Sequence, residues 1–181
     1  RHICVFSINK LMGSNKNLVF LGMMGSGKTT LGKIVSKKLN KKFFDIDELI
    51  EIQAGMTISN IFQKKGELFF RKFEEKISLQ ILKKSNSVIS LGGGAFINKK
   101  IQKEILKNHI SIWLKWDNKN LISRIKNSYK RPIAIQLSDI DLNKLIDDRS
   151  KIYSKAKYQI KCDRITKSEL MERIIRLNDK G

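Results

Sequence analysis

Short apolar runs alternate with longer amphipathic segments along the chain, which is typical of strands that alternate with helices. The apolar runs predict strands at about residues 18–21, 43–47, 87–91, 110–115 and 158–162. A helical repeat of apolar positions predicts helices at about residues 31–39, 48–54, 57–65, 68–83, 98–107, 119–126, 142–156 and from 166 onward. Such alternation predicts an α/β unit with a parallel sheet covered on both faces, and ligands at the carboxyl ends of the strands.

Two segments lack a regular pattern. Residues 1–16 begin with a positive charge and hold only a short apolar stretch. We therefore read them as a leader outside the domain, with Met12 as a candidate start, and expect a single domain over 17–181. Residues 127–138 contain the only proline, Pro132, and we expect a mobile basic loop there.

Composition narrows the class of protein. Of the 181 residues, 41% are hydrophobic, and no apolar run approaches the ~18 residues that a membrane span requires. We therefore expect one soluble domain, without a membrane segment, that works as a monomer. Cys4 and Cys162, like His2 and His109, lack the spacing of a disulfide framework or a metal cluster, which favours a cytoplasmic setting.

The net charge of +20 first suggests a nucleic-acid partner, because a positive field attracts polyanions. All but eight of the 37 basic residues are lysines, however, and they are spread over almost every segment. No stretch interleaves them with aromatic residues, and Trp113 and Trp116 fit a buried strand edge equally well. We therefore expect no nucleic-acid partner, and we treat the few arginines as candidates for bidentate recognition of phosphate or carboxylate.

The strongest local motif lies directly after the first predicted strand. Residues 22–30, with the sequence GMMGSGKTT, fit the P-loop pattern GxxxxGK[ST] and open a helix. The glycines allow backbone N–H groups to point at one anion, and the helix N-terminus adds partial positive charge. Lys28 would reach the β- and γ-phosphates and Thr29 would bind Mg²⁺. The residues expected to hold the nucleotide are Gly25, Ser26, Gly27, Lys28, Thr29 and Thr30.

Aspartates end the second predicted strand and glycines follow the third, at the carboxyl edge of the predicted sheet. Asp45 and Asp47 are two residues apart, so on an extended chain their side chains would share one polar crevice, although helix N-capping is the commoner fate of such aspartates. Residues Gly92, Gly93 and Gly94 follow the third strand, and we expect a backbone nest open to a small polar ligand.

These residues together resemble the shikimate kinase family over nearly the whole chain from about residue 17. The resemblance rests on the order and spacing of GMMGSGKTT, FFDID, GELFFRKFEE, SLGGG, a KRP segment and DDRSKIY. It implies a three-layer, doubly wound, five-stranded parallel sheet of order 2-3-1-4-5. It also implies transfer of the γ-phosphoryl group of ATP to the 3-hydroxyl of shikimate, with Mg²⁺ as cofactor and shikimate and ATP as the small-molecule partners.

The resemblance also implies roles for residues of the acceptor site. Asp47 would hold the attacking hydroxyl and accept its proton, and Arg71 and Arg149 would pair with the shikimate carboxylate. Glu74 would support Arg71, and the three glycines at 92–94 would bind ring hydroxyls. The Phe62 and Phe70 side chains would wall the pocket.

On the nucleotide side, the resemblance implies that Thr29 ligates Mg²⁺ and that Asp45 holds it through water. Residues of about 118–138 would form a mobile lid. In that lid, Arg131, before Pro132, would close on the phosphates, and Arg124 would pack near adenine. Lys28, Asp47 and Arg131 are therefore the expected catalytic residues.

Four other functions fit parts of the sequence. A gluconate kinase would explain the P-loop and the acid after the second strand but not the glycines with Arg71 and Arg149. A nucleoside-monophosphate kinase needs a nucleotide-monophosphate segment that we do not find, and a nucleic-acid-dependent ATPase should have an acid where the third strand ends in Gly92. A catalytically inactive binding module would have lost a catalytic group, whereas Lys28 and Asp47 are present.

Overall fold

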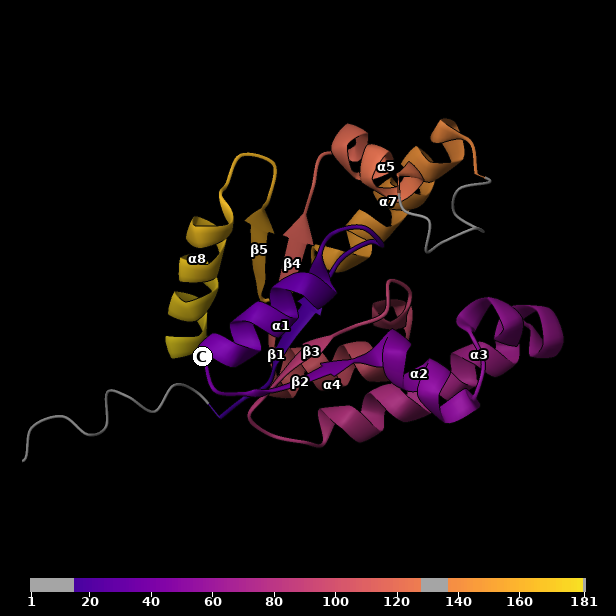
Figure 1. The fold of residues 1–181 in the computed structure, drawn as a ribbon, viewed down its shortest axis with the longest axis horizontal. Helices are drawn as coiled ribbons and strands as arrows, with labels where there is room; N and C mark the ends of the chain where they lie inside the picture. The colour runs from indigo at the N-terminus through magenta and orange to yellow at the C-terminus, as the bar shows by residue number, and fades with distance from the viewer. Residues whose placement is uncertain (1–14, 128–136, 181) are drawn as a thin grey trace, which may run out of the picture.

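A computed structural model describes residues 15–127 and 137–180 of the chain. Its five strands form one parallel sheet in the order β2-β3-β1-β4-β5, which confirms the expected topology (Figure 1). The strands are β1 (Leu18–Leu21), β2 (Lys42–Asp45), β3 (Ser87–Ser90), β4 (Ile110–Lys115) and β5 (Tyr158–Lys161). Arg131 and Pro132 lie outside the described residues.

The helices follow the predicted pattern with boundaries shifted by a few residues. They are α1 (Lys28–Lys38), α2 (Ile46–Ala54), α3 (Ile58–Leu82), α4 (Lys99–Asn108), α5 (Asn118–Lys126), α7 (Asp139–Tyr153) and α8 (Lys167–Asp179), with a short 3-10 turn at Ala95–Ile97. The two helices predicted on either side of Gly66 form α3, which is broken at Gly66 by non-helical dihedral angles. The predicted capping box of Thr166 and Glu169 starts α8.

Two separate cores flank the sheet, because successive residues of a strand face opposite sides. Leu18 and Phe20 of β1 are fully buried against α1 and α8. Val19 and Leu21 are buried on the other face, in a core that α2, α3, α4, α5 and α7 complete. The result is the expected three-layer arrangement, with helices on both faces of the sheet (Figure 1).

The carboxyl ends of β1, β2 and β3 are adjacent, because these strands are neighbours in a parallel sheet. The P-loop follows β1, Asp45 ends β2, and the three glycines follow β3. The fold therefore brings segments far apart in the sequence to the carboxyl edge of the sheet, where open α/β proteins bind their ligands.

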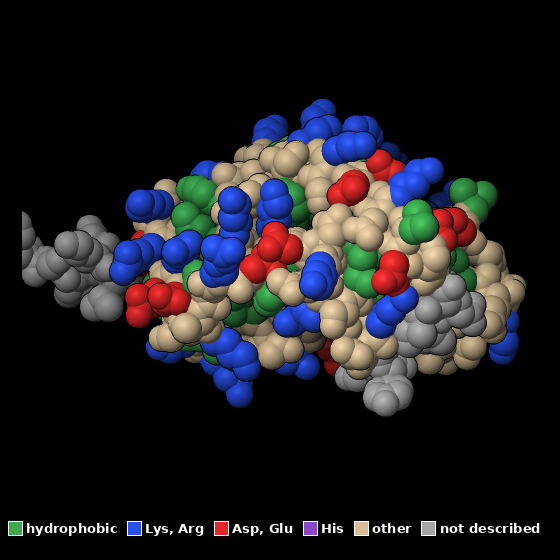
Figure 2. Space-filling model, turned by 90° about the horizontal axis from the view of Figure 1, so that it is seen from above, with side chains coloured by type: hydrophobic (Ala, Val, Ile, Leu, Met, Phe, Trp, Pro, Cys, Tyr) green, Lys and Arg blue, Asp and Glu red, His purple; other side chains and the backbone are tan. Residues whose placement is uncertain are grey.

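Positive side chains are spread over one face of the molecule. Figure 2 shows Lys and Arg side chains spread over the visible face, with Asp and Glu among them. Within residues 15–127 and 137–180, no helix is long and apolar enough to span a bilayer.

Candidate active site

The loop between β1 and α1 has the geometry of a P-loop. Gly27 caps α1 with φ 91°, a left-handed conformation that L side chains rarely adopt, so glycine is required there. The Lys28 ammonium donates to the carbonyl oxygens of Gly22 (2.8 Å) and Met23 (3.0 Å) and thus lies across the loop. A cation and a helix N-terminus therefore face the same small space, as binding of a phosphate group requires.

Asp45 joins the P-loop helix to the second strand. Its Oδ2 accepts a hydrogen bond from the Thr29 hydroxyl (2.6 Å), and its Oδ1 accepts from the backbone N–H groups of Asp47 (3.0 Å) and Glu48 (3.3 Å). Asp45 is therefore both the N-cap of α2 and the partner of Thr29. The prediction that Asp45 and Asp47 share an extended strand is wrong, because this capping starts the helix at Ile46 and places Asp47 in its first turn.

The Thr29–Asp45 pair fits the chemistry of Mg²⁺. Both side chains present oxygen atoms, and Mg²⁺ is commonly held by one or two carboxylates together with substrate phosphates and water. Among the described residues, no group of three or more His, Cys, Asp or Glu forms an all-protein metal site. The donor set therefore fits a metal that arrives with nucleotide phosphates.

A pocket of about 180 Å³ lies beside the P-loop. Its polar or charged lining residues are Asp47, Arg71, Glu74, Gly93, Gly94 and Arg149, and its apolar lining residues are Met23, Met24, Ile58, Phe62, Phe70 and Leu145. The structure thus brings together most of the predicted acceptor residues, including both phenylalanines. Gly92, which was also predicted to bind substrate, is buried and does not line the pocket. Four apolar lining residues were not predicted from the sequence, because their apolar character carried no functional signal: Met23, Met24, Ile58 and Leu145.

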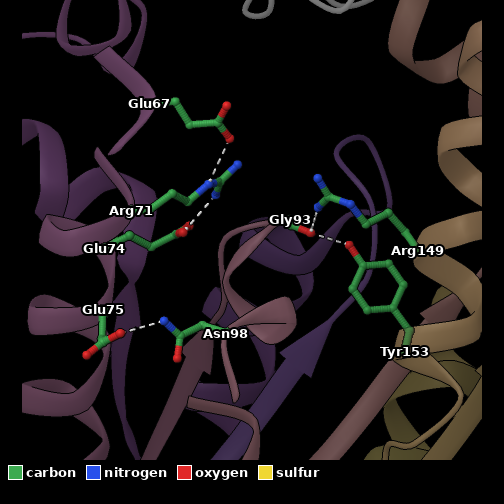
Figure 3. A network of polar contacts seen from close by, with 8 residues as sticks. All are labelled: Glu67, Arg71, Glu74, Glu75, Gly93, Asn98, Arg149 and Tyr153. Carbon is green, nitrogen blue, oxygen red and sulfur yellow. Dashed lines mark hydrogen bonds and ion pairs between the residues drawn. The ribbon is translucent and has the colours of Figure 1, made fainter. Parts of the chain in front are cut away.

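Arg71 is held from two sides on α3 (Figure 3). Its Nη1 donates to Glu74 Oε2 (2.8 Å), which is the predicted contact, and its Nε donates to Glu67 Oε1 (3.2 Å). The Glu74 side chain is buried, and this burial raises the pKa of its carboxyl against the opposing effect of Arg71. Glu74 therefore fixes the direction of the guanidinium.

The glycines after β3 are predicted to form a backbone nest, and this stays a prediction. Side chains from other elements also lie close to two of them: a Cβ on Gly92 would lie 2.7 Å from Asp47 Oδ1, and a Cβ on Gly94 would lie 2.5 Å from Arg71 Nη1. The glycines therefore allow the acid and the arginine to reach the pocket.

Arg149 enters from α7, opposite Arg71 (Figure 3). Its Nη1 donates to the carbonyl oxygen of Gly93 (2.6 Å), and the buried Tyr153 hydroxyl donates to the same oxygen. The sequence had a signal for Tyr153: it lies four residues after Arg149 and so on the same helix face.

Arg124 lies against the outer side of the P-loop. Its Nε donates to the carbonyl oxygen of Gly25 (2.8 Å), and its guanidinium lies 4.3 Å from the centre of the Trp116 ring. Trp116 in turn donates from Nε1 to the carbonyl oxygen of Ser26 (3.0 Å). The loop thus has a planar cation stacked on an aromatic ring at its outer edge.

Comparison with known proteins identifies the family. The family model described as "Shikimate kinase" matches residues 24–178. The chain is 39% identical to the shikimate kinase of Sulfurihydrogenibium sp. (strain YO3AOP1) over 88% of its length and 96% of that protein. This chain is also 37% identical to the shikimate kinase of Bartonella quintana (strain Toulouse), over 97% of this chain and 86% of that protein.

A solved structure agrees with the sequence comparisons. The fold resembles shikimate kinase from Acinetobacter baumannii in complex with shikimate, with a TM-score of 0.83 and 28% identity over 91% of this chain and 93% of that one. The match of the family model covers both arginines, the P-loop lysine and Asp47. The chain therefore belongs to the shikimate kinase family.

Proposed function

We propose that this chain uses the described site for the reaction of its family, transfer of the γ-phosphoryl group of ATP to the 3-hydroxyl of shikimate. One observation carries the proposal: Arg71 and Arg149 face one pocket from opposite sides, and Asp47 lines that pocket beside the P-loop. Two forked cations suit the carboxylate of an acid, and a nearby carboxylate suits its hydroxyl.

Arg71 and Arg149 bind the shikimate carboxylate. Their Nη1 atoms are already engaged by Glu74 and Gly93, so each guanidinium is oriented before the substrate arrives. Orientation in advance reduces the entropy lost on binding. The loop at Gly93 and Gly94 contacts ring hydroxyls, and the carboxylate then fixes which hydroxyl faces the P-loop.

Asp47 holds the attacking hydroxyl and accepts its proton as the oxygen bonds to phosphorus. The carboxylate stands in the first turn of α2, on the side of the pocket that adjoins the P-loop. In phosphoryl transfer, positioning and charge stabilisation supply most of the rate enhancement. Asp47 therefore contributes mainly by placing the oxygen in line with the γ-phosphate.

The P-loop residues 25–30 bind the ATP phosphates, and Lys28 neutralises charge on the β- and γ-phosphates. Thr29 and Asp45 hold Mg²⁺, which when bound neutralises charge on the transferring group. Arg124, stacked on Trp116 beside Gly25, packs near adenine. The predicted role of Arg131 falls outside the described residues.

The position of the phosphate on the product tests this proposal. Wild-type protein incubated with Mg-ATP and shikimate should give one product, which ³¹P NMR with proton correlation identifies as the 3-phosphate. A phosphate on another hydroxyl would contradict the orientation that the two arginines impose.

Replacement of Thr29 by valine should make the enzyme demand more Mg²⁺. The variant keeps the shape of the side chain but removes the hydroxyl next to Asp45, so half-maximal activity should require more than about tenfold more Mg²⁺. Titration of activity with MgCl₂ at constant ATP measures this. Ser36→Ala, which removes a hydroxyl from the same helix away from Asp45, should leave the Mg²⁺ requirement unchanged; an equal shift in both variants would argue against the metal role.

Replacement of Gly94 by alanine should weaken binding of shikimate more than it weakens the fold. The new methyl would force the Arg71 guanidinium away from its place, and we expect the KM for shikimate to rise about tenfold with little change in Tm. Gly93→Ala should have a smaller effect, because its Cβ would meet atoms only at 3.6 Å. If Gly93→Ala proved the worse of the two, crowding by Arg71 would not be the reason for the glycine.

A further inference from the structure

The carbonyl oxygen of Gly93 accepts hydrogen bonds from two side chains of α7 (Figure 3). One donor is Arg149, which the proposed function places on the substrate carboxylate. The other is the hydroxyl of Tyr153, one helical turn further on. A carbonyl oxygen has two lone pairs, so both donors can bind it at once.

The Tyr153 side chain is buried and packed in the core. Its side chain is 1% exposed, and its ring lies 5.9 Å from the ring of Trp113 on β4. Its hydroxyl also lies 3.9 Å from the sulfur of Met23, which belongs to the P-loop and lines the pocket. Burial raises the pKa of Tyr153 to about 12, so the hydroxyl stays protonated and donates at neutral pH.

The direction of the Gly93 carbonyl determines that of the neighbouring N–H. The described residues contain no cis peptide bond, so the Gly93 carbonyl and the Gly94 N–H lie on opposite sides of one planar unit. Because the carbonyl points toward α7, the Gly94 N–H points away from it, to the side where Arg71 approaches Gly94. The two donors on α7 therefore aim a backbone donor toward the acceptor side of the pocket.

We propose that Tyr153 is a positioning residue for the acceptor: it fixes the Gly93–Gly94 peptide and, through the shared carbonyl, the guanidinium of Arg149. The inference rests on the proposed function of this site. Arg149 keeps its Nη1 bond to the carbonyl and offers its other N–H groups to a carboxylate, and the second bond from Tyr153 holds the carbonyl in the same direction as the substrate binds.

The test is Tyr153→Phe, which removes one hydroxyl and keeps the packing against Trp113. We expect the KM for shikimate to rise about five- to tenfold, while the KM for ATP changes by less than about twofold. The matched control is Tyr158→Phe on β5, which should leave both KM values unchanged. The change should also be non-additive with Arg149→Lys, because both variants act on one carbonyl.

The outcomes separate this inference from the proposed function. A wild-type protein without shikimate-dependent turnover would overturn both. An active wild type with an unchanged shikimate KM in Tyr153→Phe would overturn the positioning role alone. Equal rises in the KM for shikimate and the KM for ATP, together with a lower Tm, would also overturn the positioning role, because a purely structural hydroxyl would affect both substrates.

Discussion

Replacement of Asp47 by asparagine is expected to lower kcat for shikimate phosphorylation by about 10²–10⁴-fold. Asparagine has nearly the same shape, so it keeps an oxygen near the substrate hydroxyl but cannot accept the proton. The bond of Asp47 to Asp45, the partner of Thr29, comes from the Asp47 backbone N–H and survives the substitution. Affinity for ATP should therefore stay within about twofold of wild type.

Steady-state kinetics with shikimate and calorimetric titration with a non-hydrolysable ATP analogue measure the two quantities. Asp179→Asn, at the exposed end of α8, is the matched control and should retain wild-type kcat. Full kcat in Asp47→Asn would remove the residue from the chemical step. A parallel loss of nucleotide affinity would mean that the side chain supports the P-loop instead.

Replacement of Arg149 by lysine is expected to raise the KM for shikimate by about 10- to 100-fold. Arg149 already donates from Nη1 to Gly93 at 2.6 Å, and its planar fork leaves other N–H groups for a carboxylate. A lysine ammonium is a single point and cannot bind the carbonyl and both carboxylate oxygens in the same geometry. The loss should fall on the acceptor, with the KM for ATP little changed.

Arg176→Lys serves as the control, because Arg176 pairs with Glu172 on the exposed face of α8. It should leave both KM values at the wild-type level. An unchanged shikimate KM in Arg149→Lys would exclude Arg149 from carboxylate recognition. The carboxylate would then have to be bound by Arg71 alone.

The sequence predicted the fold well because its strongest signals are local. The P-loop pattern and the apolar runs specify β1, the loop and α1, and the alternation of elements specifies a parallel sheet. Two interpretations of Asp45 were open from the sequence, a helix cap and a site residue. The structure shows one carboxylate that caps α2 and also accepts a hydrogen bond from Thr29 of the P-loop. Periodicity could not tell that the cap would begin α2 before Asp47.

The sequence did not predict contacts between distant segments. Asp47, Glu74 and Arg71 approach the glycines after β3 from α2 and α3, and no local pattern records these contacts. Tyr153 meets Gly93 across 60 positions of sequence for the same reason. Such pairings depend on how the helices pack at the sheet edge.

The most direct test of the central claim is ADP release from purified protein with Mg-ATP, measured with each acceptor in turn. The acceptors are shikimate, gluconate, a set of nucleoside monophosphates and single-stranded nucleic acid, with a sample without acceptor as the blank. Our account predicts release above the blank with shikimate alone. Release that depends on another acceptor, or none with shikimate despite nucleotide binding, would contradict it.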